Sequence, residues 1–153
     1  MLETPHVIVG AAIATKVPNP LISIPLIFAS HFVLDMVPHW NPHLNTEKNK
    51  FGKVTNLSSA IVVGDVILAF VSGILIATRA LPDTFQFFHI LAASFISVSP
   101  DVIEGPYFFL NMKSKFIRAW IKFQKSIQAD TSPLPGLAIQ VATVIATLGW
   151  ILS

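Results

Sequence analysis

The stretch SHFVLDMVPHWNPH, residues 30–43, places three histidines and one aspartate at the end of a long apolar run. This run, from Pro20 to Val37, has the length and composition of a helix inserted in a membrane. In such a helix, His31 and Asp35 lie one turn apart, so their side chains share a face and can bind the same ligand. The spacing is typical of metal-binding helices, and the pair is the first candidate site.

The composition of the chain is that of an integral membrane protein. Of its 153 residues, 53% are hydrophobic and 12% are charged, and the mean hydropathy is +0.68, whereas soluble domains carry about 25% charged residues. We expect a single membrane domain over residues 1–153 and no removable signal peptide, because no basic segment precedes the first apolar run. The net charge of +2 is too small to favour nucleic-acid binding. Because cysteine is absent, any metal ligands must be nitrogen or oxygen atoms.

The apolar runs predict an all-α bundle with four or five membrane-inserted helices. The first is short, about 20 Å long, and is either partly inserted or buried among the others; we expect it to begin with Thr4 as its N-cap. The segment Asn41 to Asn56 is predicted to be a polar loop. Pro100 predicts a break in the fourth run at Ser99 to Asp101. The predicted inserted helices cover residues 5–17, 20–37, 57–78, 85–110 and 134–152.

Residues 113–128 have a different pattern, in which an apolar stripe and a basic stripe alternate at helical spacing. This is typical of an amphipathic helix lying on a membrane surface. Its basic side chains are expected to attract anionic lipid headgroups. The apolar stripe contains Phe116, Trp120, Phe123 and Ile127, and the basic stripe contains Lys115, Arg118, Lys122 and Lys125.

The distribution of basic residues predicts the orientation in the membrane. The loop at residues 41–56 carries three lysines and the segment at residues 113–128 carries five basic residues, whereas only Lys16 and Arg79 remain elsewhere. Because basic residues favour the cytoplasmic side, we expect both segments there.

Four acidic residues lie within or at the ends of the predicted membrane helices: Asp35, Asp65, Asp101 and Glu104. A charged group in the membrane costs at least ~2.5 kcal/mol and therefore needs a partner. At 1.5 Å per residue, these carboxylates and His31 lie roughly 3–14 Å from the cytoplasmic end of their helices. We therefore expect them to meet on that side of the membrane.

Histidines and carboxylates together favour zinc, with manganese and iron as alternatives. Each candidate also has a structural interpretation: His31 can bond a carbonyl or Asp65, and Asp101 can cap a helix after Pro100. His39 follows Pro38, where the helix can already have ended. His6 follows Pro5 and can face the same pocket, whereas His43 and His89 are expected at the membrane interface.

The segments PHVIVGAAIA, SHFVLDMVPHW and SPDVIEGPYFF, around a central helix with Asp65, resemble a bacterial family of small integral membrane proteins described as membrane-bound metal-dependent hydrolases. More distantly, HFVLD is similar to the HxxxD zinc-ligand helix of zinc-dependent phospholipase C and P1-type nucleases, which cleave phosphoesters. In the family a histidine is common in the segment matching KFQKSIQ, where this chain has Gln124. The resemblance implies a multi-pass protein of the bacterial inner membrane. It implies metal ligands at His6, His31, Asp35, His39, Asp65, Asp101 and Glu104.

Two functions remain open at this stage. The first is a membrane-embedded metal-dependent hydrolase that acts on a phosphoester, such as a phospholipid, from the cytoplasmic leaflet. The second is a non-catalytic subunit or scaffold of a larger membrane complex, in which the polar groups only hold helices together and the apolar surface meets protein partners.

Overall fold

The structure, a computed structural model, describes residues 1–153 and contains eight helices and no strand. The predicted all-α class is therefore confirmed. The helices are α1 (Glu3–Lys16), α2 (Pro20–Asp35), α3 (Leu44–Phe51), α4 (Asn56–Thr78), α5 (Thr84–Val102), α6 (Gly105–Leu110), α7 (Lys115–Ile127) and α8 (Pro133–Leu152).

Three of these helices, α4, α5 and α8, are long and apolar enough to cross a membrane. The apolar helix α2 has 16 residues and is shorter. Most of the large apolar side chains on α4 and α8 are exposed on the outside of the bundle. Such outward apolar faces are typical of helices whose solvent is lipid rather than water.

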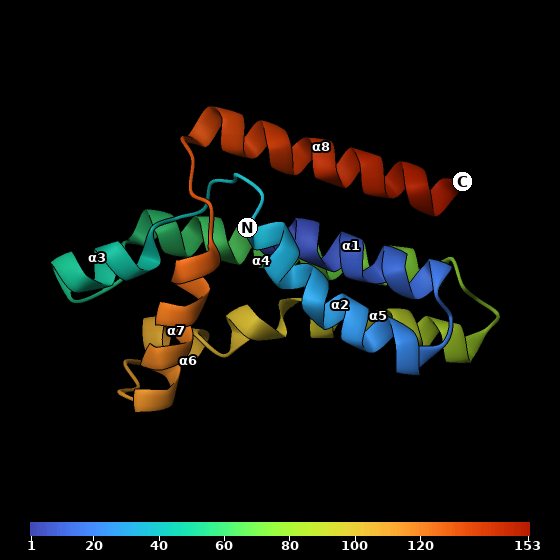
Figure 1. The fold of residues 1–153 in the computed structure, drawn as a ribbon, viewed down its shortest axis with the longest axis horizontal. Helices are drawn as coiled ribbons and strands as arrows, with labels where there is room; N and C mark the ends of the chain where they lie inside the picture. Colours follow the sequence, from blue (N-terminus) through green and yellow to red (C-terminus); the bar gives the residue numbers. More distant parts are fainter.

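The short helix α1 lies at the centre of the bundle, where it contacts α2, α4, α5 and α8. Figure 1 shows α1, α2, α4, α5 and α8 running roughly side by side. Of the two alternatives for the first apolar run, burial among the other helices is the one observed, because Ala11, Ala12 and Ala14 are fully buried. These small side chains let the neighbouring backbones approach closely, as is common between membrane helices.

The three short helices α3, α6 and α7 gather at one end of the bundle (Figure 1). A small apolar cluster of Val54, Phe108, Ile117 and Ile121 holds this end together. The ammonium group of Lys48 on α3 donates to the carbonyl of Phe108 at 3.1 Å. The segment after α2 and the basic helix thus lie at the same end of the bundle.

The polar segment at residues 41–56 is not a loop throughout, because it contains α3. Glu47 of α3 accepts hydrogen bonds from the Ser58 hydroxyl at 2.6 Å and the Thr55 amide at 2.8 Å. These bonds fasten α3 to the start of α4. The Ser58 hydroxyl holds the pKa of the Glu47 carboxyl below its usual range.

The predicted helix break lies further along the chain than expected. Helix α5 continues through Ser99 to Asp101 and ends at Val102, and α6 begins at Gly105. Pro100 has no N–H to donate to the carbonyl of Ile96, but the Ser99 hydroxyl donates to that carbonyl at 2.8 Å. This substitute bond allows the helix to pass the proline.

Candidate metal centre

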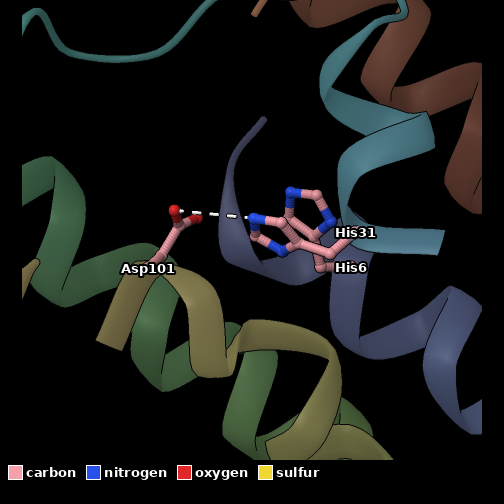
Figure 2. Close-up of side chains that lie close together, drawn as sticks. All are labelled: His6, His31 and Asp101. Carbon is pink, nitrogen blue, oxygen red and sulfur yellow. Dashed lines mark ion pairs between the residues drawn. The ribbon is translucent and has the colours of Figure 1, made fainter. Parts of the chain in front are cut away.

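Polar side chains from α1, α2, α5 and α7 meet inside the bundle, near the end where the short helices gather. Figure 2 shows the rings of His6 and His31 stacked on one another, with the carboxylate of Asp101 directed at His31. The ring centroids are 4.1 Å apart. Possible ligand atoms of His6, His31 and Asp101 all lie within 4.8 Å of one another. The sequence therefore correctly indicated that these three residues lie together.

His31 is fully buried and its ring orientation is fixed by the backbone of α5. Its Nδ1 lies 2.8 Å from the carbonyl oxygen of Ser97, which can only accept, so Nδ1 carries a proton. In the neutral ring, Nε2 then presents a lone pair. This Nε2 lies 3.6 Å from carboxylate oxygens of both Asp35 and Asp101. A backbone carbonyl that orients a histidine in this way is common behind metal-binding rings.

Asp35 is fully buried, and its two oxygens face different neighbours. One oxygen lies 3.4 Å from Nε2 of His6 and 3.9 Å from Nε2 of His39, and the amino group of Met1 contacts the same oxygen. The other oxygen faces His31 and accepts from the amide of Gln128 at 3.5 Å. Asp35 is therefore the residue that joins the histidines into one cluster.

His39 lies beyond the end of α2 in a segment fixed by the loop after α7. Its amide donates to the carbonyl of Ala129 at 3.0 Å, and its own carbonyl accepts from the amide of Thr131 at 2.9 Å. The ring Nδ1 donates to the carbonyl of Val37 at 2.8 Å, so Nε2 is again the free nitrogen. Burial lowers the pKa of the His39 imidazole, which favours the neutral ring that a metal requires.

Gln124 of α7 is the site residue that charge alone could not indicate. Its amide nitrogen donates to the carboxylates of Asp101 at 3.1 Å and Glu104 at 2.9 Å, and to the carbonyl of Pro100 at 3.2 Å. The amide oxygen is consequently directed at Nε2 of His31, 3.2 Å away. The lone pairs of the Gln124 amide oxygen and of His31 Nε2 repel each other unless His31 carries a second proton or a cation lies between these two atoms.

The expected apolar stripe of α7 is not its buried face. Phe116 and Phe123 are largely exposed, whereas Ile117, Ile121 and Gln124 are buried. The predicted stripe therefore faces outward, as it does on a helix in contact with lipid. A single glutamine in an otherwise apolar buried face, at spacings of four and three residues, was the sequence signal for Gln124.

Asp65 lies apart from the histidines, at the N-terminus of α1, and Glu104 bonds the cluster through the amide of Gln124. Asp65 accepts from the amide of Glu3 at 2.5 Å and from the hydroxyl of Thr4 at 2.6 Å. Helix α1 therefore begins at Glu3, and a side chain from α4, rather than Thr4, caps it. The alternative bond between His31 and Asp65 is not present, since His31 bonds Ser97 and Gln124.

His89, expected at the membrane interface, does not face the outside of the bundle. Its ring is buried inside the bundle, and Nε2 bonds the Ser23 hydroxyl at 2.8 Å. The histidine thus ties α2 to α5. His43 is exposed, as expected for an interfacial residue.

A cavity of about 670 Å³ connects the cluster with the outside of the bundle. Its polar end is lined by Asp101, Glu104 and Gln124, together with Asp65 and Glu3. His6, His31 and Asp35 lie behind these residues and are fully buried. A molecule in the cavity therefore reaches Asp101 and Gln124 first.

The donor set fits a divalent metal ion such as zinc. Ligand atoms at 2.0–2.1 Å from a tetrahedral ion lie about 3.4 Å apart. Four histidine–carboxylate separations in the cluster are 3.4 to 3.9 Å, and the ligand atoms of His6, His31 and Asp101 lie within 4.8 Å of one another. Both ring nitrogens of His6 and Nε2 of His39 are buried without a hydrogen-bond partner. Unsatisfied buried nitrogens are costly, and coordination of a cation would satisfy one nitrogen of His6 and Nε2 of His39.

Comparison of the chain with protein-family models, with characterised proteins and with solved structures found no match.

Proposed function

We propose that this protein is a membrane-embedded, metal-dependent hydrolase that cleaves a phosphoester presented from the cytoplasmic leaflet. The observation that carries the proposal is the convergence of three histidine Nε2 atoms on the two oxygens of Asp35, with two of these nitrogens lacking any partner. The resemblance to bacterial membrane-bound metal-dependent hydrolases agrees with this proposal. So does the more distant similarity of HFVLD, with His31 and Asp35, to the HxxxD zinc-ligand helix of zinc-dependent phospholipase C and P1-type nucleases.

The proposed ligands are drawn from His6, His31, Asp35, His39 and Asp101, and the proposed ion is zinc, with manganese and iron as alternatives. A tetrahedral catalytic zinc would take three of these residues and leave its fourth position for water. A bound ion of this kind supplies a Lewis acid and a water molecule of lowered pKa. The residues of the chain provide a group for proton transfer and hold the carboxylates in position. Glu104 borders the cavity and can hold or release a proton there, while the amide of Gln124 orients the carboxylates of Asp101 and Glu104.

In this proposal the protein resides in the bacterial inner membrane, with α1, α2, α4, α5 and α8 inserted. Helices α3 and α7 lie on the cytoplasmic side, because most basic residues of the chain lie on or beside these two helices and basic residues favour that side. Lys115, Arg118, Lys122 and Lys125 of α7 attract anionic headgroups at roughly 1 kcal/mol each. The substrate is thereby drawn to the end of the bundle that holds the polar cluster.

The second candidate is a non-catalytic membrane subunit or scaffold. It is favoured by the contact of the Met1 amino group with Asp35, because that ion pair neutralises a buried carboxylate without a metal. The extensive apolar surface of α4 and α8 would then contact protein partners.

Metal analysis of the purified protein in detergent tests the proposal, with hydrolysis of phosphatidic acid measured on the same samples. We expect a stoichiometric divalent metal, and at least a 10-fold loss of metal and of hydrolysis in His31→Ala. Arg79→Ala, at an exposed position at the far end of α4, is the control and should retain both. If the wild-type chain holds no metal after zinc addition, the hydrolase proposal is wrong and the scaffold function is favoured.

A further inference from the structure

The cavity that ends at the polar cluster continues as a long groove between α4 and α5. Its α4 side is lined by Val62, Val66, Ala69, Phe70, Gly73 and Ile74. These residues recur every three or four positions and so lie along one helix face. At 1.5 Å per residue, the twelve steps from Val62 to Ile74 extend over about 18 Å.

The polarity of this groove changes along its length. The end near α1 and α7 carries Asp65, Asp101 and Glu104, whereas the part along α5 is lined by Leu91, Phe95 and Val98. The apolar part is open toward the bilayer, since Phe70 and Phe95 are 70% and 62% exposed. An amphiphile can therefore enter sideways from the membrane with its polar group toward the cluster.

Positive charge borders the polar end. Lys125, whose ammonium group pairs with Asp130, lines the groove and also a second cavity of about 370 Å³, which contains Arg118 and Lys122 as well. The two cavities share Asn45, Ile121 and Lys125. A ligand with an apolar chain in the groove would thus place an anionic headgroup beside a cluster of basic side chains.

We propose that the groove between α4 and α5 binds one acyl chain of an anionic glycerophospholipid, with the phosphate near Asp101 and Lys125. The inference deepens the proposed function by naming its substrate class. It depends on that function for the cleavage of the lipid and, through the proposed cation, for part of the headgroup binding. The carboxylates at this end would repel a phosphate, so the proposed cation also contributes to headgroup binding.

The cavity that forms the groove measures about 670 Å³. That volume lies within the range of small-molecule sites, about 300–1,000 Å³. An acyl chain is narrower than a helix and matches both the shape and the lateral opening.

The test uses the full chain in phosphatidylcholine bilayers that contain phosphatidic acid with a photoactivatable diazirine on its acyl chain. After irradiation, mass spectrometry locates the labelled residues. We expect adducts to concentrate on Phe70, Phe95 and Val98. Val66→Trp should reduce labelling of these residues at least 5-fold by filling the groove, whereas Ile67→Trp should leave it unchanged. Both residues are exposed on α4, but only Val66 lines the groove.

Three comparisons make the result decisive. Adducts spread evenly over the outward faces of α4 and α8 in the unmodified chain would overturn the inference, because they would show only general lipid contact. Equal labelling by a diazirine-bearing phosphatidylcholine would overturn the preference for an anionic headgroup. Groove labelling without hydrolysis by the metal-loaded protein would instead refute the proposed function and leave lipid binding intact. Hydrolysis without groove labelling would refute lipid binding in the groove and leave the proposed function intact.

Discussion

At the scale of single residues, Asp35 and Asp65 show two ways in which a buried carboxylate is stabilised in this bundle. Asp35 faces three histidine rings and the amino group of Met1. Asp65 instead accepts from the first amides of α1, where the helix dipole also favours a negative charge. The first arrangement leaves ligand nitrogens free for a cation, whereas the second uses the carboxylate as a helix cap.

Asp65→Ala should therefore weaken the fold without removing metal. Loss of a helix cap costs about 1–2 kcal/mol, which thermal denaturation in detergent would detect as a lower midpoint. Asp83→Ala is the control, because Asp83 caps α5 through the Gln86 amide at 3.0 Å and lies away from the cluster. A loss of metal in Asp65→Ala that Asp83→Ala does not show would mean that Asp65 is a ligand.

The sequence located most of the clustered residues because a charge inside an apolar run is costly wherever it points. Counting along a helix predicts the depth of a residue but not the direction of its side chain, so Asp65 could not be separated from Asp101. Gln124 carries no charge, and its position follows from the packing of α7 against α2 and α5. The Ser97 and Val37 carbonyls that orient the histidines are also products of packing, which no local pattern contains.

At the scale of elements, Gly136 and Gln140 join the start of α8 to the segments beside the cluster. A Cβ on Gly136 would lie 2.4 Å from the backbone nitrogen of Trp40 and 2.6 Å from its Cβ. The amide of Gln140 donates to the Trp40 carbonyl at 2.7 Å, and its oxygen accepts from the Leu2 amide at 2.9 Å. The start of α8 thus fixes the segment that carries His39.

Gly136→Ala should destabilise the protein by about 1–3 kcal/mol, because the added methyl group must displace backbone atoms. Gly149→Ala is a matched control in the same helix, since a Cβ there meets nothing within 4 Å. It should be neutral or slightly stabilising. Thermal denaturation of both variants, with metal content as a second measurement, distinguishes them. Equal stability would mean that α8 does not approach Trp40 so closely.

The boundaries of the long helices were predictable to within a few residues because their apolar runs are continuous. Two features could not be predicted in this way. The Ser99 hydroxyl donates to the carbonyl that Pro100 leaves without a partner, so α5 continues past Pro100 and the break lies at Ile103 and Glu104. Helix α3 has a mostly polar sequence, and its contacts with α4 and α6 rather than a periodic apolar pattern hold it in place.

At the scale of the whole molecule, the short helices gather at one end of the bundle (Figure 1). The hydrogen bonds of Gln124 on α7 with His31 and Asp101 place the polar cluster beside them. The basic residues of α3 and α7 also lie there, whereas Arg79 lies in the turn between α4 and α5, at the opposite end of α4. An amphiphile that binds the groove between α4 and α5 would therefore approach the cluster from the leaflet in which the basic residues lie.

Labelling of single cysteines tests this orientation directly, because the natural chain has no cysteine. In oriented membrane vesicles, Asn49→Cys on α3 and Lys113→Cys before α7 should react with a membrane-impermeant maleimide from the cytoplasmic side. Leu81→Cys, in the turn at the other end of α4, should react only from the opposite side. If Asn49→Cys and Lys113→Cys react from different sides, the two segments cannot lie in one leaflet. The basic residues would then no longer draw anionic lipid to the cluster, and the proposed route of the substrate would be wrong.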